Sequence, residues 1–118
     1  MNTFDFGNGP VPAHQHPNGG GWVADTAQVA ESAYVGIDAL VYGNARVLGN
    51  ARVCGNAMVS ENARVFGDAQ VYGYAWVYGD AKVFGDAMVS GNARVSGDAR
   101  VYGGAEVSGD ARVSGDIG

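Results

Sequence analysis

Valine occupies every sixth position along most of this 118-residue chain. The series begins at Val23, ends at Val113 and fills all sixteen of its positions. Alanine keeps the same period from Ala27 to Ala111. The typical unit reads Gly-Asn/Asp-Ala-x-Val-x, as in residues 43–48. A repeat this strict, without insertion or deletion, predicts an architecture built by stacking one small unit.

A six-residue period does not suit a helix. Six residues make about 1.7 helical turns, so successive valines would scatter around the helix surface, and a glycine in each unit would cost about 1 kcal/mol. In a strand, the Ala-x-Val-x stretch alternates between the two faces. The Gly-Asn or Gly-Asp pair tolerates the left-handed backbone of a tight corner. Each hexad is therefore predicted to form one short strand and one corner.

The outward residues distinguish two ways of stacking the hexads. Three hexads per coil give a triangular prism, and two give a flattened solenoid. Coils of three hexads align basic side chains in one column and aromatic side chains in the next, whereas coils of two place Arg46 over Met58 and Gln70. Because three hexads separate the chemistry better, we predict an all-β parallel β-helix of about five 18-residue coils.

This pattern resembles the left-handed parallel β-helix of the hexapeptide-repeat superfamily. The resemblance covers residues 23–117 and is carried by the aliphatic position, the small residue four later, and Asn or Asp at the corner. It implies left-handed coiling, which the spacing does not show and which departs from the usual right-handed crossover. The Gly-Asn-Ala-Arg-Val wording is also similar to bacterial and prophage repeat proteins, many of which are named hexapeptide transferases.

Residues 1–21 lie outside the repeat, and residues 22–118 form the repeat domain. The first segment holds all three prolines, both histidines and a run of three glycines, so we expect neither strand nor helix in it. Because an open solenoid end exposes core and unpaired backbone, we predict an irregular N-terminal cap, with Phe4, Phe6 and Trp22 filling the first coil. The alternative is an arm that folds onto a neighbouring chain.

Composition excludes several classes of protein. No apolar run is long enough for a transmembrane helix, and the first residues lack the pattern of a secretory signal. The single cysteine excludes an internal disulfide framework, and a cytoplasmic location is expected. The net charge of −5 argues against a general nucleic-acid coat but permits a local basic face.

The resemblance implies one enzymatic interpretation, an acyltransferase with a histidine general base. The coils contain no histidine and no inserted loop, so only His14 and His16 remain. The sequence signals neither a positioned partner for them nor an acyl-carrier site, and we predict no catalytic residue and no cofactor. The same two histidines are the candidate metal ligands, but two ligands are too few for a stable zinc site. Cys54, at an outward position, is expected to be a plain thiol.

Two sides of the predicted prism carry candidate binding residues. The first, termed the basic–aromatic side, holds Arg46, Leu48, Arg64, Phe66, Lys82, Phe84, Arg100 and Tyr102. Basic groups among aromatics are typical of nucleic-acid and nucleotide sites and equally of protein interfaces, although duplication of the repeat alone would also copy an arginine column. The second, termed the apolar side, holds Leu40, Tyr42, Met58, Trp76 and Tyr78. An outward apolar patch predicts self-association.

These features together predict a non-catalytic, rigid binding scaffold. It is expected to form a homodimer or homotrimer, with the apolar side as the candidate interface and the choice of side left open by the sequence. The expected partner is a protein, with nucleic acid or a nucleotide as the alternative ligand. A second interpretation is a phage-encoded inhibitor of a CRISPR-type host defence complex or of a nucleic-acid-processing complex. A third is a hexapeptide-family acyltransferase, active or degenerate.

Overall fold

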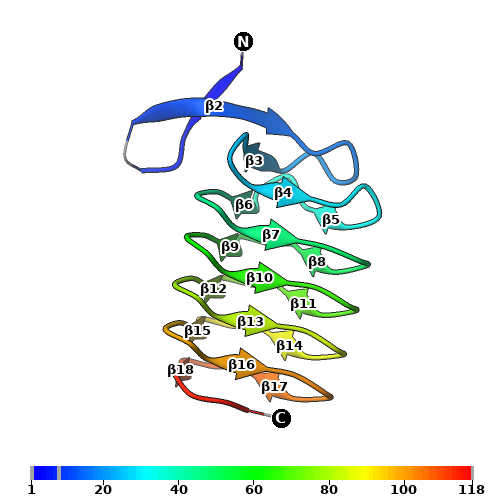
Figure 1. Ribbon diagram of the computed structural model, residues 1–118, viewed down its shortest axis with the longest axis vertical. Helices are drawn as coiled ribbons and strands as arrows, with labels where there is room; N and C mark the ends of the chain where they lie inside the picture. The colour runs from blue at the N-terminus through cyan, green and yellow to red at the C-terminus, as the bar shows by residue number, and fades with distance from the viewer. Residues whose placement is uncertain (1, 8, 118) are drawn as a thin grey trace.

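The computed structural model describes residues 2–7 and 9–117, which form eighteen short strands in one solenoid (Figure 1). The longest dimension of the molecule is 41 Å. Among the described residues there is no helix of the length and hydrophobicity needed to cross a membrane.

Three sheets form the three sides of the prism. The apolar side is the outer face of an eight-stranded sheet, made of β1 (Thr3–Asp5), β2 (Pro10–Gln15), β3 (Trp22–Ala24), β6 (Leu40–Val41), β9 (Met58–Val59), β12 (Trp76–Val77), β15 (Arg94–Val95) and β18 (Arg112–Val113). The basic–aromatic side is formed by β4 (Gln28–Val29), β7 (Arg46–Val47), β10 (Arg64–Val65), β13 (Lys82–Val83) and β16 (Arg100–Val101). The third side is formed by β5 (Tyr34–Val35), β8 (Arg52–Val53), β11 (Gln70–Val71), β14 (Met88–Val89) and β17 (Glu106–Val107).

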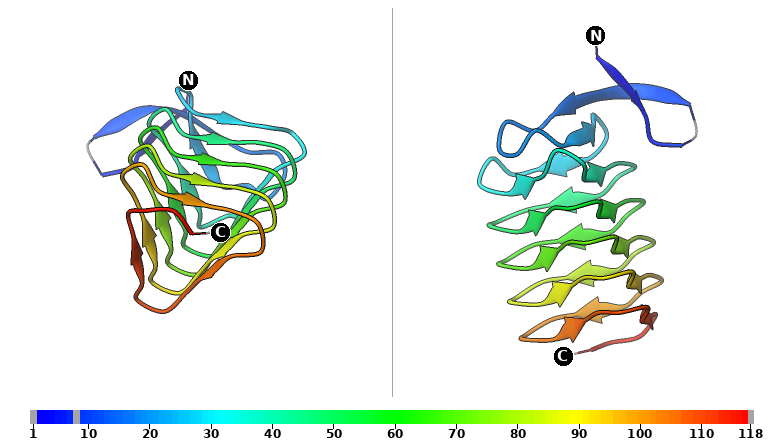
Figure 2. Two further views of the ribbon diagram at one scale, coloured as in Figure 1. Left: turned by 60° about the horizontal axis from the view of Figure 1, so that its bottom comes forward. Right: turned by 180° about the vertical axis from the view of Figure 1, so that it is seen from behind.

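The register confirms the coil of three hexads. Within the coils the strands are parallel, and Arg64 of β10 pairs with Arg46 on one side and with Lys82 on the other. Each pairing joins residues 18 positions apart, so every column predicted from the sequence exists. The cross-section of the coils is triangular (Figure 2, left).

The solenoid is left-handed. In Figure 1 the chain runs to the right through near strands such as β7 and β10, returns behind through β9 and β12, and descends with each turn. Viewed from the C-terminal end, as in the left panel of Figure 2, the same path runs clockwise towards the viewer. A clockwise path that approaches the viewer is a left-handed screw, as the resemblance implied.

The core is a column of valine and alanine. Every repeat valine from Val35 to Val101 and every repeat alanine from Ala33 to Ala99 is 0% exposed. Corner backbone groups bond along the axis, as where the Asn50 N–H donates to the Gly67 carbonyl at 2.9 Å. Gly67 itself has a φ of 69°, a left-handed conformation that disfavours side chains. Small residues inside and glycine at the corners therefore permit coils to stack without a gap.

The prediction that residues 1–21 contain no regular strand is wrong. β1 and β2 form an antiparallel hairpin, and β2 continues antiparallel onto β3 (Figure 1). Pro10 and Pro12 lie two residues apart, so their nitrogens face the same edge of β2. The residues that alternate with them face the other edge, towards β1, where the Ala13 N–H donates to the Asn2 carbonyl at 3.0 Å. Prolines spaced by two residues leave this ladder intact, which is why they do not break the strand.

The aromatic residues of this segment do not fill the first coil. Phe4 stacks on Trp22 with ring centroids 5.0 Å apart, and Phe6 stacks on Tyr42 at 5.0 Å. Trp22 and Tyr42 occupy outward positions, so the hairpin, which extends the sheet beyond β3, bends back over the outer face of β3 and β6. Ala13 of β2 and Ala24 of β3 pair with each other, and both are buried.

The loop between β2 and β3 covers the N-terminal edge of the third side. The Val35 N–H donates to the Asn18 carbonyl at 3.1 Å, and the Gly21 N–H donates to the Val35 carbonyl at 2.9 Å. His16 is 4% exposed and its Nε2–H donates to the Ala33 carbonyl at 2.9 Å. At the other end of the solenoid, Ile117 pairs with Val101 in a parallel bridge.

Candidate binding surfaces

The basic–aromatic side brings all eight of its predicted residues onto one side of the prism. Arg46, Arg64, Lys82 and Arg100 precede the valines of β7, β10, β13 and β16 and pair in register. The residues that follow these valines form the neighbouring column. In that column Phe66 stacks on Phe84 at 4.9 Å with an interplanar angle of 1°, and Phe84 stacks on Tyr102 at 5.4 Å and 11°.

This stacking determines what the aromatic column offers to a ligand. The ring faces of Phe66 and Phe84 lie against each other and those of Phe84 and Tyr102 do likewise. A base stacks on a free ring face, and a ladder stacked internally presents ring edges instead. The column is therefore a rigid apolar strip and not a stacking platform for successive bases.

The basic column borders an acidic one. A groove of about 450 Å³ is lined by Asn62, Arg64, Asp80, Lys82, Asp98 and Arg100. The carboxylates come from the corners that lead into β13 and β16. Among the described residues these cations form no ion pair with the two carboxylates. Adjacent opposite charges weaken the field that the side presents to a polyanion.

The apolar side also assembles as predicted. The pairing of β6, β9 and β12 places Leu40, Met58 and Trp76 in one column, and each is half-buried. The aromatic surface continues beyond the prediction towards the N-terminus through Phe4, Phe6 and Trp22. Towards the C-terminus it ends at Arg94, whose guanidinium carbon lies 6.0 Å from the centroid of the Trp76 ring.

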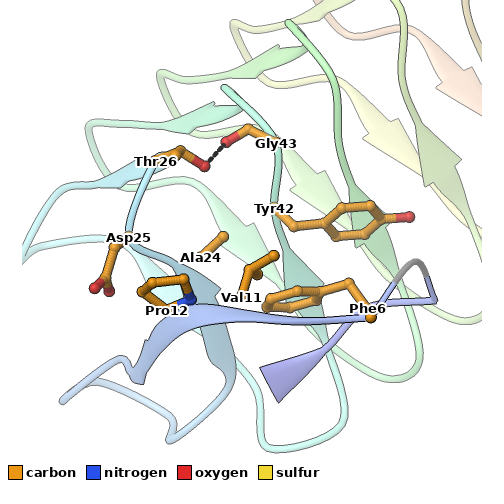
Figure 3. Close-up of a pocket in the computed structure, with 9 residues that line it drawn as sticks. Phe6, Val11, Pro12, Ala24, Asp25, Thr26, Tyr42 and Gly43 are labelled. Carbon is orange, nitrogen blue, oxygen red and sulfur yellow. Dashed lines mark hydrogen bonds between the residues drawn. The ribbon is translucent and has the colours of Figure 1, made fainter. Parts of the chain in front are cut away.

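Two hollows open beside this side. One, of about 370 Å³, lies between the hairpin and the first corner and is lined mainly by Phe6, Val11, Pro12, Ala24 and Tyr42 (Figure 3). The other, of about 490 Å³, is lined by Phe6, Gly7, Tyr42, Gly43, Ser60, Glu61 and Trp76. Phe6, Tyr42 and Gly43 line both hollows, so the stacked Phe6–Tyr42 pair separates them. Sequence reasoning missed both, because they depend on the position of the hairpin.

The two histidines have different partners. His14 Nδ1 lies 2.7 Å from Asp25 Oδ1, and both side chains are half exposed, whereas His16 is buried against the Ala33 carbonyl. Sequence reasoning missed Asp25 as the partner of His14; the antiparallel pairing of β2 with β3 brings them together. Within the described residues, no three His, Cys, Asp or Glu side chains gather as metal ligands.

Cys54 is half-buried on the third side. Burial raises the pKa of its thiol, and the nearby Arg52 guanidinium lowers the pKa in part. A thiol with a raised pKa carries little thiolate at neutral pH, so it is a poor nucleophile there.

Three segments of the chain, residues 39–53, 51–65 and 93–106, match the YdcK beta solenoid repeat family model. The chain is a β-solenoid repeat protein. All three segments lie in the coils, outside the N-terminal hairpin. Neither the curated proteins nor the solved structures include a significant match to the chain.

Proposed function

We propose that this β-solenoid is a non-catalytic, rigid scaffold that binds a protein partner through its basic–aromatic side. The observation that carries the proposal is the stacked ladder of Phe66, Phe84 and Tyr102 beside a column of cations. Aromatic and arginine side chains are enriched at the centres of protein interfaces. A ladder held by three stacked coils loses little side-chain entropy on binding, which favours association.

A protein partner fits this side better than nucleic acid does. The ladder offers ring edges and no series of free faces, and Asp80 and Asp98 share a groove with Lys82 and Arg100. A partner with an apolar strip flanked by both signs of charge matches this surface, whereas a phosphate backbone would meet the carboxylates.

The test is capture of partners from cells that express the protein naturally, comparing the wild type with an Arg64→Glu/Phe66→Ala variant. We expect the variant to fold and to lose at least tenfold of the specifically captured protein, with or without nuclease treatment. The matched control is Arg52→Glu/Tyr72→Ala, which removes one arginine and one aromatic from the third side. Equal capture by the Arg64→Glu/Phe66→Ala variant would show that the basic–aromatic side is not the site, and loss of the partner on nuclease treatment alone would assign it to nucleic acid.

Self-association through the apolar side is a second part of the proposal. It is supported by Trp76 and Tyr78, two large aromatic side chains that are partly exposed on the outer face. The equivalent positions one coil later hold Arg94 and Ser96, so the repeat itself does not require aromatic residues there. A Trp76→Arg/Tyr78→Ser variant copies those residues, so the coil accepts them. We expect the wild type to sediment as a dimer or trimer and this variant as a monomer, with Met88→Arg on the third side leaving the oligomer intact.

The finer assignment to the hexapeptide-repeat superfamily is likewise proposed. It is supported by the unbroken hexad, the three-sided coil and the left-handed path. The enzymatic alternative, an acyltransferase, rests on the His14–Asp25 pair, because a carboxylate on Nδ1 would leave Nε2 free to act as a base. Release of free thiol from acetyl-coenzyme A with a panel of amine acceptors tests it: His14→Ala must abolish the activity, and no activity in the wild type would exclude this alternative.

A further inference from the structure

The hollow of about 490 Å³ on the apolar side combines aromatic rings with a single carboxylate. Its walls include the side chains of Phe6, Tyr42 and Trp76, and Glu61 is the one charged residue among the described residues that line it. Phe6 stacks on one face of the Tyr42 ring, and both residues line the hollow (Figure 3 shows the two rings together). None of these features was used by the proposed binding of a protein through the basic–aromatic side.

Ser60 makes the hollow possible. In its column the residues one coil earlier and one coil later are Tyr42 and Tyr78, so the smaller serine leaves room that the Trp76 indole partly fills. Ser60 is 1% exposed, and its Oγ accepts a hydrogen bond from the Trp76 indole N–H at 2.9 Å. That bond fixes the indole and satisfies its one donor, so Trp76 can contribute to a ligand through its π surface.

Glu61, at the rim of the hollow, has an unfavourable backbone conformation. It has a φ of 58° and is the only described non-glycine residue in the left-handed region. From residue 43 onward the other corners place glycine at this position. Its carboxylate Oε2 accepts a hydrogen bond from the Gly79 N–H at 2.7 Å, which directs the group along the corner. Strain retained at one position of an otherwise uniform repeat points to a local role.

We propose that this hollow binds an organic cation, of the quaternary or alkyl ammonium class. Aromatic faces attract such cations through the ring quadrupole, and cages of aromatic rings recognise quaternary ammonium groups. The Trp76 ring already lies beside a cation in the structure, the guanidinium of Arg94 at 6.0 Å. Glu61 supplies the opposite charge, and the net charge of −5 attracts cations over longer distances.

The test is a titration followed by the two indole N–H signals in a ¹⁵N–¹H NMR spectrum. Choline is the quaternary probe, and 3,3-dimethylbutan-1-ol is its neutral isostere of the same shape. We expect choline to shift the Trp76 signal saturably, with Kd on the order of millimolar, while Trp22 serves as the internal reference. Equal shifts with the neutral alcohol, or no shift with choline, would overturn the proposal.

Variants of Glu61 separate the carboxylate from the fold. Glu61→Gln keeps the size of the side chain, and Glu61→Gly restores the residue that the other corners use, so folding is safeguarded. Both are expected to weaken choline binding about fivefold to tenfold, whereas Glu106→Gln on the third side is expected to leave it unchanged. Unchanged affinity in both Glu61 variants would also contradict the proposal.

The source of the cation is identified by a second probe. Nα-acetyl-lysine amide, titrated in the same way, represents a side chain of a protein partner. Tighter binding of choline assigns the hollow to a free small molecule, and tighter binding of the lysine derivative assigns it to a partner residue. The titrations are run at two protein concentrations, because self-association through the apolar side would cover the hollow and weaken the apparent affinity at the higher one.

Discussion

At the scale of the residue, the valine column decides whether the chain folds. Val65 is 0% exposed in the middle of the solenoid. Val65→Asp would bury an unpaired carboxylate and lose a buried aliphatic group, and the two effects together amount to several kcal/mol, comparable with the whole stability of a small domain. We expect no cooperative melt by circular dichroism. Arg64→Asp, one residue away and outward, is the control and should melt cooperatively; a cooperative melt of Val65→Asp would contradict the assigned core.

The corner glycines carry two separable constraints. Gly55 has a φ of 62°, and a Cβ there would lie 2.9 Å from the Gly73 nitrogen in the next coil, whereas Gly103 has the same φ but nothing within 4 Å. Both Gly→Ala variants bear the left-handed backbone cost of about 1–2 kcal/mol. We expect Gly55→Ala to lose about 1 kcal/mol more in urea unfolding, because its coil must shift. Equal losses would mean that contact between corners contributes nothing.

The thiol of Cys54 gives a prediction about pH. Because its pKa is raised by burial, iodoacetamide should alkylate Cys54 more slowly than free cysteine at pH 7, and the rate should continue to rise at a pH where free cysteine has reached its plateau. Arg52 lowers that pKa, so Arg52→Ala should slow alkylation at pH 7 further. Mass spectrometry of quenched samples measures both rates. Faster alkylation in Arg52→Ala would show that greater exposure of the Cys54 thiol outweighs the loss of the positive charge beside it.

At the scale of the element, the strands of the coils were predictable and the hairpin was not. The conformation of each hexad is determined by its own residues: the valine points inward, its neighbours point outward and glycine turns the chain. The hairpin depends instead on contacts between distant residues, such as Phe6 with Tyr42 and His14 with Asp25. When each residue is considered alone, Pro10 and Pro12 are expected to break a strand. Their spacing by two instead places both nitrogens on one edge of the strand, which permits the strand to form. The hollows depend on the hairpin and were missed for the same reason.

The hairpin is predicted to shield the outward side chain of Trp22 in the first coil from solvent through its aromatic contacts. Phe4 stacks on Trp22, whereas Val11 of the same hairpin is 39% exposed. In a Trp76→Phe background, which leaves Trp22 as the only tryptophan, Phe4→Ala should shift the emission of Trp22 to longer wavelength and increase its quenching by acrylamide. Val11→Ala should change neither. An unchanged spectrum in Phe4→Ala would show that the hairpin does not cover Trp22 in solution.

At the scale of the whole molecule, an unbroken 18-residue register makes each coil a removable unit. Deleting residues 67–84 joins Phe66 to Gly85 and keeps every later residue on its own side, with Tyr102 next to Phe66 in the ladder. Solenoid stability is approximately a sum over repeats and their interfaces. We therefore expect a folded protein whose Tm is lower by about 5–10 °C.

Deleting residues 67–75 instead places the later valines at corner positions, and that variant should be unfolded by circular dichroism. If both variants melted alike, the valine register would not govern folding. If the 18-residue deletion alone failed to fold, the central coil would hold contacts that neighbouring coils cannot replace.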